Sequence, residues 1–377
     1  MRKFFKAFFA ILLLLVISFA AYALISGKTY LFKAVYYNFA GIDDYKIFTN
    51  DTVLTAEPQP WKIAPRPGLK VPDSLASLLS DLGTVAVLVV KNREVIYEKY
   101  DDGYSDTSLS NSFSVAKSIT SLLVGAAIRE GLIRSENDLV GNYLPEFSTG
   151  LATKLRIRDL LTMSSGSDWN ESYANPFSVT TEAYYGSDLR STATSVTIKK
   201  QPGSYFSYKS GDTELLGLVL EKATGRSLAS YAAEKLWRPL GAEQPALWST
   251  DRTGGSAKAY CCFNSNARDF ARLGQLMLDS GRWNGTTIIN PDYFKASVTG
   301  CLIPDETGTP ANYYGYQWWI RPSYPGVFYA RGILGQYIII IPSRQLVLVR
   351  LGHNRSSKKI DGAPAEVDAL INWGLTL

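Results

Sequence analysis

The sequence has 377 residues, of which 46% are hydrophobic and 19% are charged, a composition typical of a globular protein with one or two domains. The formal net charge of +5 is scattered along the chain without a basic run, which argues against a nucleic-acid partner. With one histidine and no Cys-x-x-Cys pair, the chain offers no ordinary zinc site.

The first 27 residues are predicted to be a signal anchor or a signal peptide. Residues 1–6 are basic, and residues 7–25 carry no charge over a length that can span a bilayer. The basic end stays in the cytoplasm, so the body is expected to be extracytoplasmic, on the periplasmic side. Ala21-Tyr22-Ala23 offers a cleavage site, and cleavage would make the protein secreted. Because the apolar run continues through Ile25, we favour an anchor in the inner membrane formed by residues 7–25.

Residues 28–72 contain five prolines after position 57 and are predicted to be a linker and wrap-around segment, leaving 73–377 as the main domain. Residues 84–90 form an apolar run, and a polar turn separates them from residues 95–100. This pattern predicts a β-hairpin whose first strand is central in a sheet.

The segment Ser114-Val115-Ala116-Lys117 opens a run of small and apolar residues that predicts a buried helix. Ser114 and Lys117 are three residues apart, so their side chains share one helix face. A serine hydroxyl needs a neighbouring base to become a nucleophile, and a lysine whose pKa is lowered by burial can be that base. The alternative is a helix-capping serine beside an exposed lysine. Ser356 and Lys359 repeat the spacing in a polar stretch, which we interpret as a solvated loop.

Helices fill the middle of the chain, and strands return at its end. Residues 156–166 predict a short helix followed by a turn, and helical periodicity runs through 215–223 and 267–279, closed by Gly225 and Gly281. Residues 317–320, 336–341 and 345–350 are expected to be strands. The early and late strands are therefore predicted to share one antiparallel sheet, with a helical region inserted between them.

Three cysteines, Cys261, Cys262 and Cys301, lie in a region expected to face an oxidising compartment. We expect one of the vicinal pair to bridge to Cys301 and one thiol to remain odd. A structural role is favoured over a catalytic one.

Tyr208 and Ser210 lie on a polar turn just before a predicted helix. A nearby cationic lysine would favour the Tyr208 phenolate, which could then relay protons to a leaving group. The alternative is an ordinary tyrosine followed by a helix cap. A Ser-His-Asp triad would need His353, but no G-x-S-x-G elbow exists and the βαβ alternation of that fold is missing. His353 is better interpreted as a strand-end residue.

Several motifs occur in an order that closely resembles the serine β-lactamase and penicillin-binding-protein superfamily. Within it the class C β-lactamase-like branch fits best, with its related esterases and 6-aminohexanoate-dimer hydrolases. The motifs that carry the resemblance are Ser114-x-x-Lys117, Tyr208-x-Ser210, Leu160-Leu161-Thr162-Met163-Ser164-Ser165-Gly166, Cys261-Cys262 ahead of Ala267-Arg268-Asp269-Phe270, and Tyr314-Gly315-Tyr316-Gln317-Trp318-Trp319.

The resemblance implies an α+β fold, in which helices flank an antiparallel sheet and an all-helical lobe is inserted at about 106–255. It implies acyl transfer through Ser114, with Lys117 and Tyr208 as base and acid. The oxyanion would lie between the backbone N–H groups of Ser114 and Ile333. Substrate contacts are expected from Ser210, Tyr173, Gly332 and Arg331. The expected substrate is a small ester or amide, and no metal or cofactor is implied.

One departure from the family pattern bears on the substrate. No Lys-Thr-Gly is present, and the corresponding stretch is residues 329–336, with Arg331 as a charge. This departure favours an esterase or amidase over the first alternative, a D-alanyl-D-alanine carboxypeptidase or β-lactamase of the cell wall. The second alternative is a membrane-anchored binding protein without activity, against which the retention of Ser114, Lys117 and Tyr208 argues.

Overall fold

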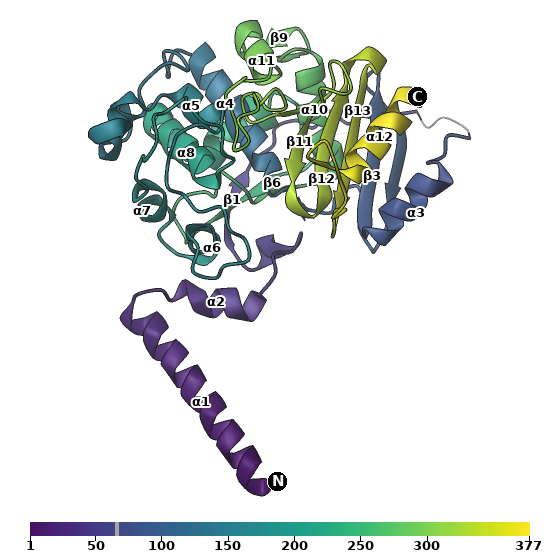
Figure 1. The fold of residues 1–377 in the computed structure, drawn as a ribbon. Coiled ribbons are helices and arrows are strands. Elements are labelled where there is room, and N and C mark those ends of the chain that lie inside the picture. Colours follow the sequence, from purple (N-terminus) through teal and green to yellow (C-terminus); the bar gives the residue numbers. More distant parts are fainter. Residues whose placement is uncertain (65–67) are drawn as a thin grey trace.

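A seven-stranded sheet joins the two ends of the main domain in the computed structural model, which describes residues 1–64 and 68–377 (Figure 1). Its order is β10-β11-β12-β13-β3-β4-β2, and all pairs are antiparallel except β2 with β4. The strands are β2 (Lys62–Ile63), β3 (Thr84–Lys91), β4 (Glu94–Tyr100), β10 (Trp319–Ile320), β11 (Phe328–Gly332), β12 (Gln336–Ile341) and β13 (Leu346–Gly352). The predicted hairpin and the sheet shared by early and late strands are confirmed. The strand predicted at 317–320 shrinks to β10, because Gln317 adopts a left-handed φ of +64°.

Helices cover both faces of this sheet (Figure 1). On one face lie α3 (Asp73–Asp81) and α12 (Ala365–Thr376), which bury Leu75 and Val367 against the strands. On the other lies α10 (Ala267–Leu278), whose apolar residues recur at helical spacing. A Cβ on Gly274 would lie 2.4 Å from Val347, so glycine allows α10 to pack directly on β13.

The helical region lies beside the sheet and is built around α4 (Val115–Arg129) and α8 (Ser210–Thr224), which pack on each other (Figure 1). Both helices are buried nearly all round, as the apolar run after Ser114 predicts. The shorter helices are α5 (Ile157–Leu161), α6 (Val179–Tyr185), α7 (Leu189–Thr194), α9 (Leu228–Ala232) with a π-helical turn at Ala233–Trp237, and α11 (Pro291–Ser297).

The α+β class is confirmed, but the inserted lobe is not entirely helical. A second sheet, in the order β1-β6-β7-β5, passes through it because β5 and β6 belong to the stretch 106–255. Its strands are β1 (Thr49–Val53), β5 (Ser110–Asn111), β6 (Ala246–Thr250) and β7 (Phe263–Ser265). Two small hairpins complete the strands: β8 (Arg282–Trp283) with β9 (Thr286–Thr287), and β14 (Lys359–Ile360) with β15 (Ala363–Pro364).

The segment predicted as a linker, residues 28–72, contributes α2 (Tyr30–Tyr37) and one strand to each large sheet. The Gln59 N–H donates to the carbonyl of Gly241, and the buried Trp61 indole donates to the carbonyl of Arg268. The segment therefore wraps around the body as an integral part of the fold. The part of it at 65–67 lies outside the described residues.

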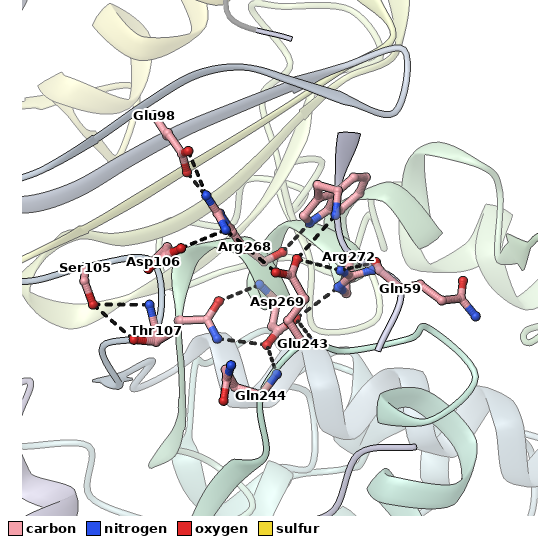
Figure 2. Close-up of polar contacts among 12 residues, drawn as sticks. Gln59, Glu98, Ser105, Asp106, Thr107, Glu243, Gln244, Arg268, Asp269 and Arg272 are labelled. Atoms are coloured by element: carbon pink, nitrogen blue, oxygen red, sulfur yellow. Dashed lines mark hydrogen bonds and ion pairs between the residues drawn. The ribbon is translucent and has the colours of Figure 1, made fainter. Parts of the chain in front are cut away.

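Charged side chains of α10 connect this helix to the elements around it, as Figure 2 shows. Arg268 pairs with Glu98 on β4 at 2.8 Å. Arg272, only 2% exposed, pairs with Asp269 at 3.0 Å and with Glu243 at 2.8 Å. Because the Arg272–Asp269 pair is buried, removal of either partner would leave an uncompensated charge in the core.

Helix α1 (Arg2–Ile25) projects from the body (Figure 1) and is long and apolar enough to cross a membrane. Within residues 1–64 and 68–377, residues 1–18 are exposed and the C-terminal end of α1 contacts the body. Ala23 is fully buried there, and the rings of Phe19 on α1 and Phe32 on α2 lie 5.9 Å apart. The predicted cleavage site is thus packed against the folded body.

The cysteine pairing differs from the expectation. Cys261 and Cys262 are bonded to each other, and Cys301 is a free, half-buried thiol. The chain turns at Cys262, whose φ is +67°, and this turn brings the neighbouring sulfurs together. Cys301 lies after α11, where its thiol contacts the carbonyl of Ala311. The expected bridge from Cys261 or Cys262 to Cys301 is therefore wrong.

Candidate active site

Ser114 lies at the N-cap position of α4, directly after a strained turn. Phe113 has a φ of +46°, which is rare for an aromatic residue, and its N–H donates to the Asn111 side chain at 2.9 Å. The turn leaves Ser114 partly exposed at the start of a buried helix. Its hydroxyl is therefore accessible at the start of α4, where the N–H groups of the first turn bond to the carbonyls of Ser112, Phe113 and Ser114.

Lys117 lies one turn further and is 1% exposed. Its Nζ atom lies 3.3 Å from Ser114 Oγ, 3.0 Å from Ser210 Oγ and 2.8 Å from the carbonyl oxygen of Tyr260. Burial lowers the pKa of Lys117 to about 8, although the negative charge of nearby carboxylates, Glu171 foremost, acts in the opposite direction. The neutral amine is thus accessible near physiological pH.

Tyr208 precedes α8 and completes the group around Ser114. Its ring centroid lies 5.2 Å from Lys117 Nζ, and its hydroxyl is hydrogen-bonded to that of Ser114. Burial raises the pKa of Tyr208 well above its usual value, more than the Ser114 hydrogen bond and the charge of Arg331 lower it. The expectation that a cationic lysine favours the Tyr208 phenolate is therefore wrong. The site therefore places a protonated Tyr208 phenol beside Lys117, whose lowered pKa favours loss of its proton.

Glu171 is a site residue to which sequence reasoning assigned no role. Its carboxylate accepts hydrogen bonds from the backbone N–H of Ser210 at 2.7 Å and from the Ser210 hydroxyl at 2.6 Å. The Trp169 indole donates to it at 2.9 Å and the Tyr173 hydroxyl at 2.5 Å. A polar chain therefore runs from Lys117 through Ser210 to Glu171. The only sequence signal was its place in the same loop as Tyr173.

The end of β11 forms the wall opposite Ser114. A Cβ on Gly332 would lie 2.2 Å from the carbonyl oxygen of Ser112, so only glycine permits this approach. Ile333 follows at the turn and lines the same cavity as Ser114. Arg331 lies 3.5 Å from the ring centroid of Trp319, and it lines a smaller hollow of about 150 Å³ beside Ser114. Arg355, which sequence reasoning also missed, lines that hollow too.

A cavity of about 240 Å³ opens in front of Ser114. Ring and aliphatic side chains dominate its walls, among them those of Phe39, Phe113, Tyr184, Tyr185, Tyr260, Ile333 and Leu334. Ser210 and Cys261 also line it, and Tyr173, a residue 54% exposed, lines both hollows and donates its hydroxyl to Glu171. Seven of the eight predicted site residues thus line these two hollows, and the eighth, Lys117, is buried next to Ser114.

Two of the sequence motifs hold α8 in place. The Ser165 hydroxyl donates to Asp212 at 2.6 Å, and burial raises the pKa of Asp212 to about 7. The Gln317 side chain accepts from Thr213 on α8 at 2.8 Å and donates to the carbonyl of Leu160 on α5 at 2.9 Å. These contacts fix the turn that carries Tyr208 and Ser210.

The residues of the alternative catalytic motifs lie away from Ser114. His353 follows β13 and contacts Asp102 at 3.2 Å on the surface, and it is not among the residues that line the two hollows at Ser114. Ser356 and Lys359 lie on an exposed stretch that ends in β14. Within residues 1–64 and 68–377, no three or more His, Cys, Asp and Glu side chains gather in a way that could hold a metal ion.

The chain is similar in sequence and in fold to several known proteins. The family model described as Beta-lactamase matches residues 73–371. A 6-aminohexanoate-dimer hydrolase from Paenarthrobacter ureafaciens is 30% identical over 74% of this chain and 76% of its own. The structure of a provisional 6-aminohexanoate-dimer hydrolase from Bacillus anthracis has a TM-score of 0.76 and 25% identity, covering 89% of this chain and 92% of its own.

A family VIII carboxylesterase shares the fold, with a TM-score of 0.65 and 18% identity over 85% of this chain and all of its own. The family model and the 30% identical relative indicate a hydrolase, and the solved structures show that the fold is shared. With its family model matched over most of its length, this chain belongs to the beta-lactamase family.

Proposed function

We propose that this protein is a serine hydrolase that cleaves an ester or amide through an acyl-enzyme on Ser114. The observation that carries the proposal is the contact between Lys117 Nζ and Ser114 Oγ, at 3.3 Å, with the pKa of Lys117 lowered to about 8 by burial. This pair supplies a nucleophile and a base in one turn of a rigid helix.

In the first half of the reaction, Ser114 Oγ bonds to the carbonyl carbon while its proton passes to the neutral amine of Lys117. The backbone N–H groups of Ser114 and Ile333 stabilise the oxyanion, a kind of contact worth about 3 kcal/mol in the transition state. The carbon–oxygen or carbon–nitrogen bond then breaks, and the leaving atom takes a proton from Tyr208, which regains one from Lys117. The protonated phenol expected from the raised pKa of Tyr208 suits this role as acid.

In the second half, water attacks the acyl carbonyl, gives one proton back to Ser114 Oγ through Lys117 and Tyr208, and releases the acid. Tyr173 and Arg331 line the hollow beside Ser114, where they contact the substrate, and Gly332 keeps the β11 wall close. Ser210 contacts Lys117 directly, so it serves the lysine as well as the substrate. With α1 as an anchor, the body lies on the extracytoplasmic side.

The test is intact-mass spectrometry of the full chain in detergent after exposure to a fluorophosphonate and, separately, to penicillin. We expect a fluorophosphonate adduct that disappears in Ser114→Ala and Lys117→Ala. Ser356→Ala, at the other S-x-x-K match, is the matched control and should keep the adduct.

The outcomes separate the alternatives. An adduct with penicillin as well would indicate cell-wall chemistry in place of the esterase or amidase function. No adduct with either reagent, in folded protein, would overturn the mechanism and leave a binding protein without activity.

A further inference from the structure

Helix α2 exposes an apolar face that the described part of the chain leaves largely uncovered. Tyr30, Leu31 and Ala34 pack on the body, whereas the other side of the helix and the residues after it are exposed. The exposed large apolar side chains are Phe32, Val35, Tyr36, Tyr37 and Phe39, with Tyr36 and Phe39 each 82% exposed. Contiguous exposed apolar side chains of this kind mark an interaction surface.

The place of α2 in the chain identifies what meets this face. Four residues, 26–29, separate the end of α1 from Tyr30, a link that spans at most about 18 Å when fully extended. Helix α1 is long enough to cross a bilayer and points away from the body, and α2 lies across its end, between α1 and α6 (Figure 1). An amphipathic helix held at the end of a membrane span lies at the bilayer surface, with its apolar side in the interface.

The apolar surface continues from α2 to the loop that carries Glu171 and Tyr173. The ring of Tyr22 on α1 lies 5.9 Å from that of Phe177, which is 50% exposed. The ring of Tyr37 at the end of α2 stacks on Tyr185 at 6.2 Å. Tyr185 and Tyr173 both line the cavity in front of Ser114. The membrane-facing surface and the cavity wall are therefore parts of one aromatic cluster.

Part of the cavity wall belongs to the same segment. Asn38, Phe39 and Ala40 directly follow α2 and line the cavity together with Ser114. On the other side of Ser114 the smaller hollow presents the guanidinium groups of Arg331 and Arg355. The site is thus apolar towards the bilayer and cationic away from it, a division that matches an amphiphile with an acyl chain and a polar or anionic head.

From this arrangement we propose that the cavity opens at the membrane surface and that the substrate is an acyl ester or amide drawn from the bilayer. The proposal rests on the serine hydrolase function proposed above. The acyl chain passes along Phe39 into the aromatic cavity, and Ser114 Oγ bonds to its carbonyl carbon as the bond to the head group breaks. Water then releases the fatty acid, so the products are that acid and an alcohol or amine.

The test uses the full chain in vesicles of phosphatidylethanolamine and phosphatidylglycerol, with two fluorogenic esters. One is 4-methylumbelliferyl acetate, which is water-soluble, and the other is 4-methylumbelliferyl oleate, which resides in the bilayer. Tyr36→Glu and Val35→Glu place a charge on the α2 face without touching the cavity lining. Leu302→Glu, at a residue that is 64% exposed, is the matched control.

We expect both α2 variants to lower oleate hydrolysis by about tenfold because a carboxylate is costly in the apolar layer, and to leave acetate hydrolysis unchanged. Leu302→Glu should change neither rate. A diazirine carried by a lipid should label peptides of α2 in the wild-type protein.

Failure of this inference and failure of the proposed function give different results. Acetate hydrolysis that depends on Ser114, with no oleate hydrolysis and no label on α2, would overturn the lipid substrate alone. Equal oleate rates in Tyr36→Glu, Val35→Glu and Leu302→Glu would do the same. A wild-type protein that shows no Ser114-dependent hydrolysis of the acetate ester would overturn the proposed function itself.

Discussion

Glu171 is bound twice to Ser210, through the backbone N–H at 2.7 Å and through the hydroxyl at 2.6 Å. The same hydroxyl accepts a hydrogen bond from Lys117 Nζ at 3.0 Å. The carboxylate thereby fixes the position of Ser210, and its negative charge acts on the lysine through one intervening side chain. We therefore infer that Glu171 is a positioning residue, whose effect on the proposed reaction is exerted through Lys117.

We predict that Glu171→Gln lowers the pKa of Lys117. Among the charges around the lysine, the Glu171 carboxylate is the largest influence that raises this pKa, so the neutral amide should let it fall below 8. The rising limb of the pH profile of kcat/KM should move to lower pH, while kcat falls because Ser210 loses part of its support. Glu146→Gln, at an exposed pair with Arg190, is the control and should leave the profile in place. An unmoved limb in Glu171→Gln would contradict the positioning role.

We predict that kcat/KM of the wild-type protein rises with pH through about 8. Below the pKa of Lys117 the ammonium form cannot accept the Ser114 proton, and above it the neutral amine can, so activity increases as the proton is lost. Asp212 has a pKa of about 7 and titrates nearby. Asp212→Asn separates the two groups, because the limb near 8 should persist in this variant if Lys117 is the base. A profile that is flat from pH 6 to 10 would exclude Lys117 as the titrating base.

The parts of the site that sequence predicted are those that local spacing determines. Ser114 and Lys117 share a helix face because of their separation along the chain, and the structure places their side chains 3.3 Å apart. Tyr208 and Ile333 were predicted from the order of motifs that resembles the family, and the structure brings both to Ser114. In the same way, apolar patterning predicted the hairpin of β3 and β4, which is confirmed.

The parts that sequence missed depend on how the chain folds over itself. Glu171 and Arg355 lie on loops, and nothing in their local sequence indicates that both end beside Ser114. The protonation of Tyr208 depends on the burial of its hydroxyl, which spacing does not reveal, so the expected phenolate is wrong. Residues 28–72 show no clear helical or strand periodicity, yet they supply a strand to each large sheet and part of the cavity wall.

We predict that Gly332→Ala abolishes activity and lowers the melting temperature. The added Cβ would lie 2.2 Å from the backbone oxygen of Ser112, so β11 must move away from the turn that carries Ser114. Ile333 would move with it, and the oxyanion N–H groups would no longer face one point. Gly326→Ala is the control, since that exposed glycine has no atoms near its Cβ position and only the strain of its φ of +81°, about 1 kcal/mol. Ester hydrolysis and thermal unfolding of both variants measure the difference. Wild-type turnover in Gly332→Ala would show that this close approach is not needed for the reaction.

We predict that, in the oxidised protein, alkylation under denaturing conditions modifies Cys301 and neither Cys261 nor Cys262. The vicinal pair is bonded to itself, so its sulfurs cannot react until they are reduced, after which all three cysteines should be alkylated. The number of alkyl groups alone does not decide the pairing, because any single bridge among three cysteines leaves one thiol. Peptide mapping identifies the alkylated cysteine. An alkyl group on Cys261 or Cys262 before reduction would contradict the 261–262 bond and indicate a bridge to Cys301 instead. Cys301→Ser is the matched control: it should remove the one reactive thiol and leave the 261–262 bond intact.

We also predict that reduction of the Cys261–Cys262 pair lowers ester hydrolysis in Cys301→Ser protein. Cys261 lines the cavity, and the carbonyl of the neighbouring Tyr260 accepts a hydrogen bond from Lys117.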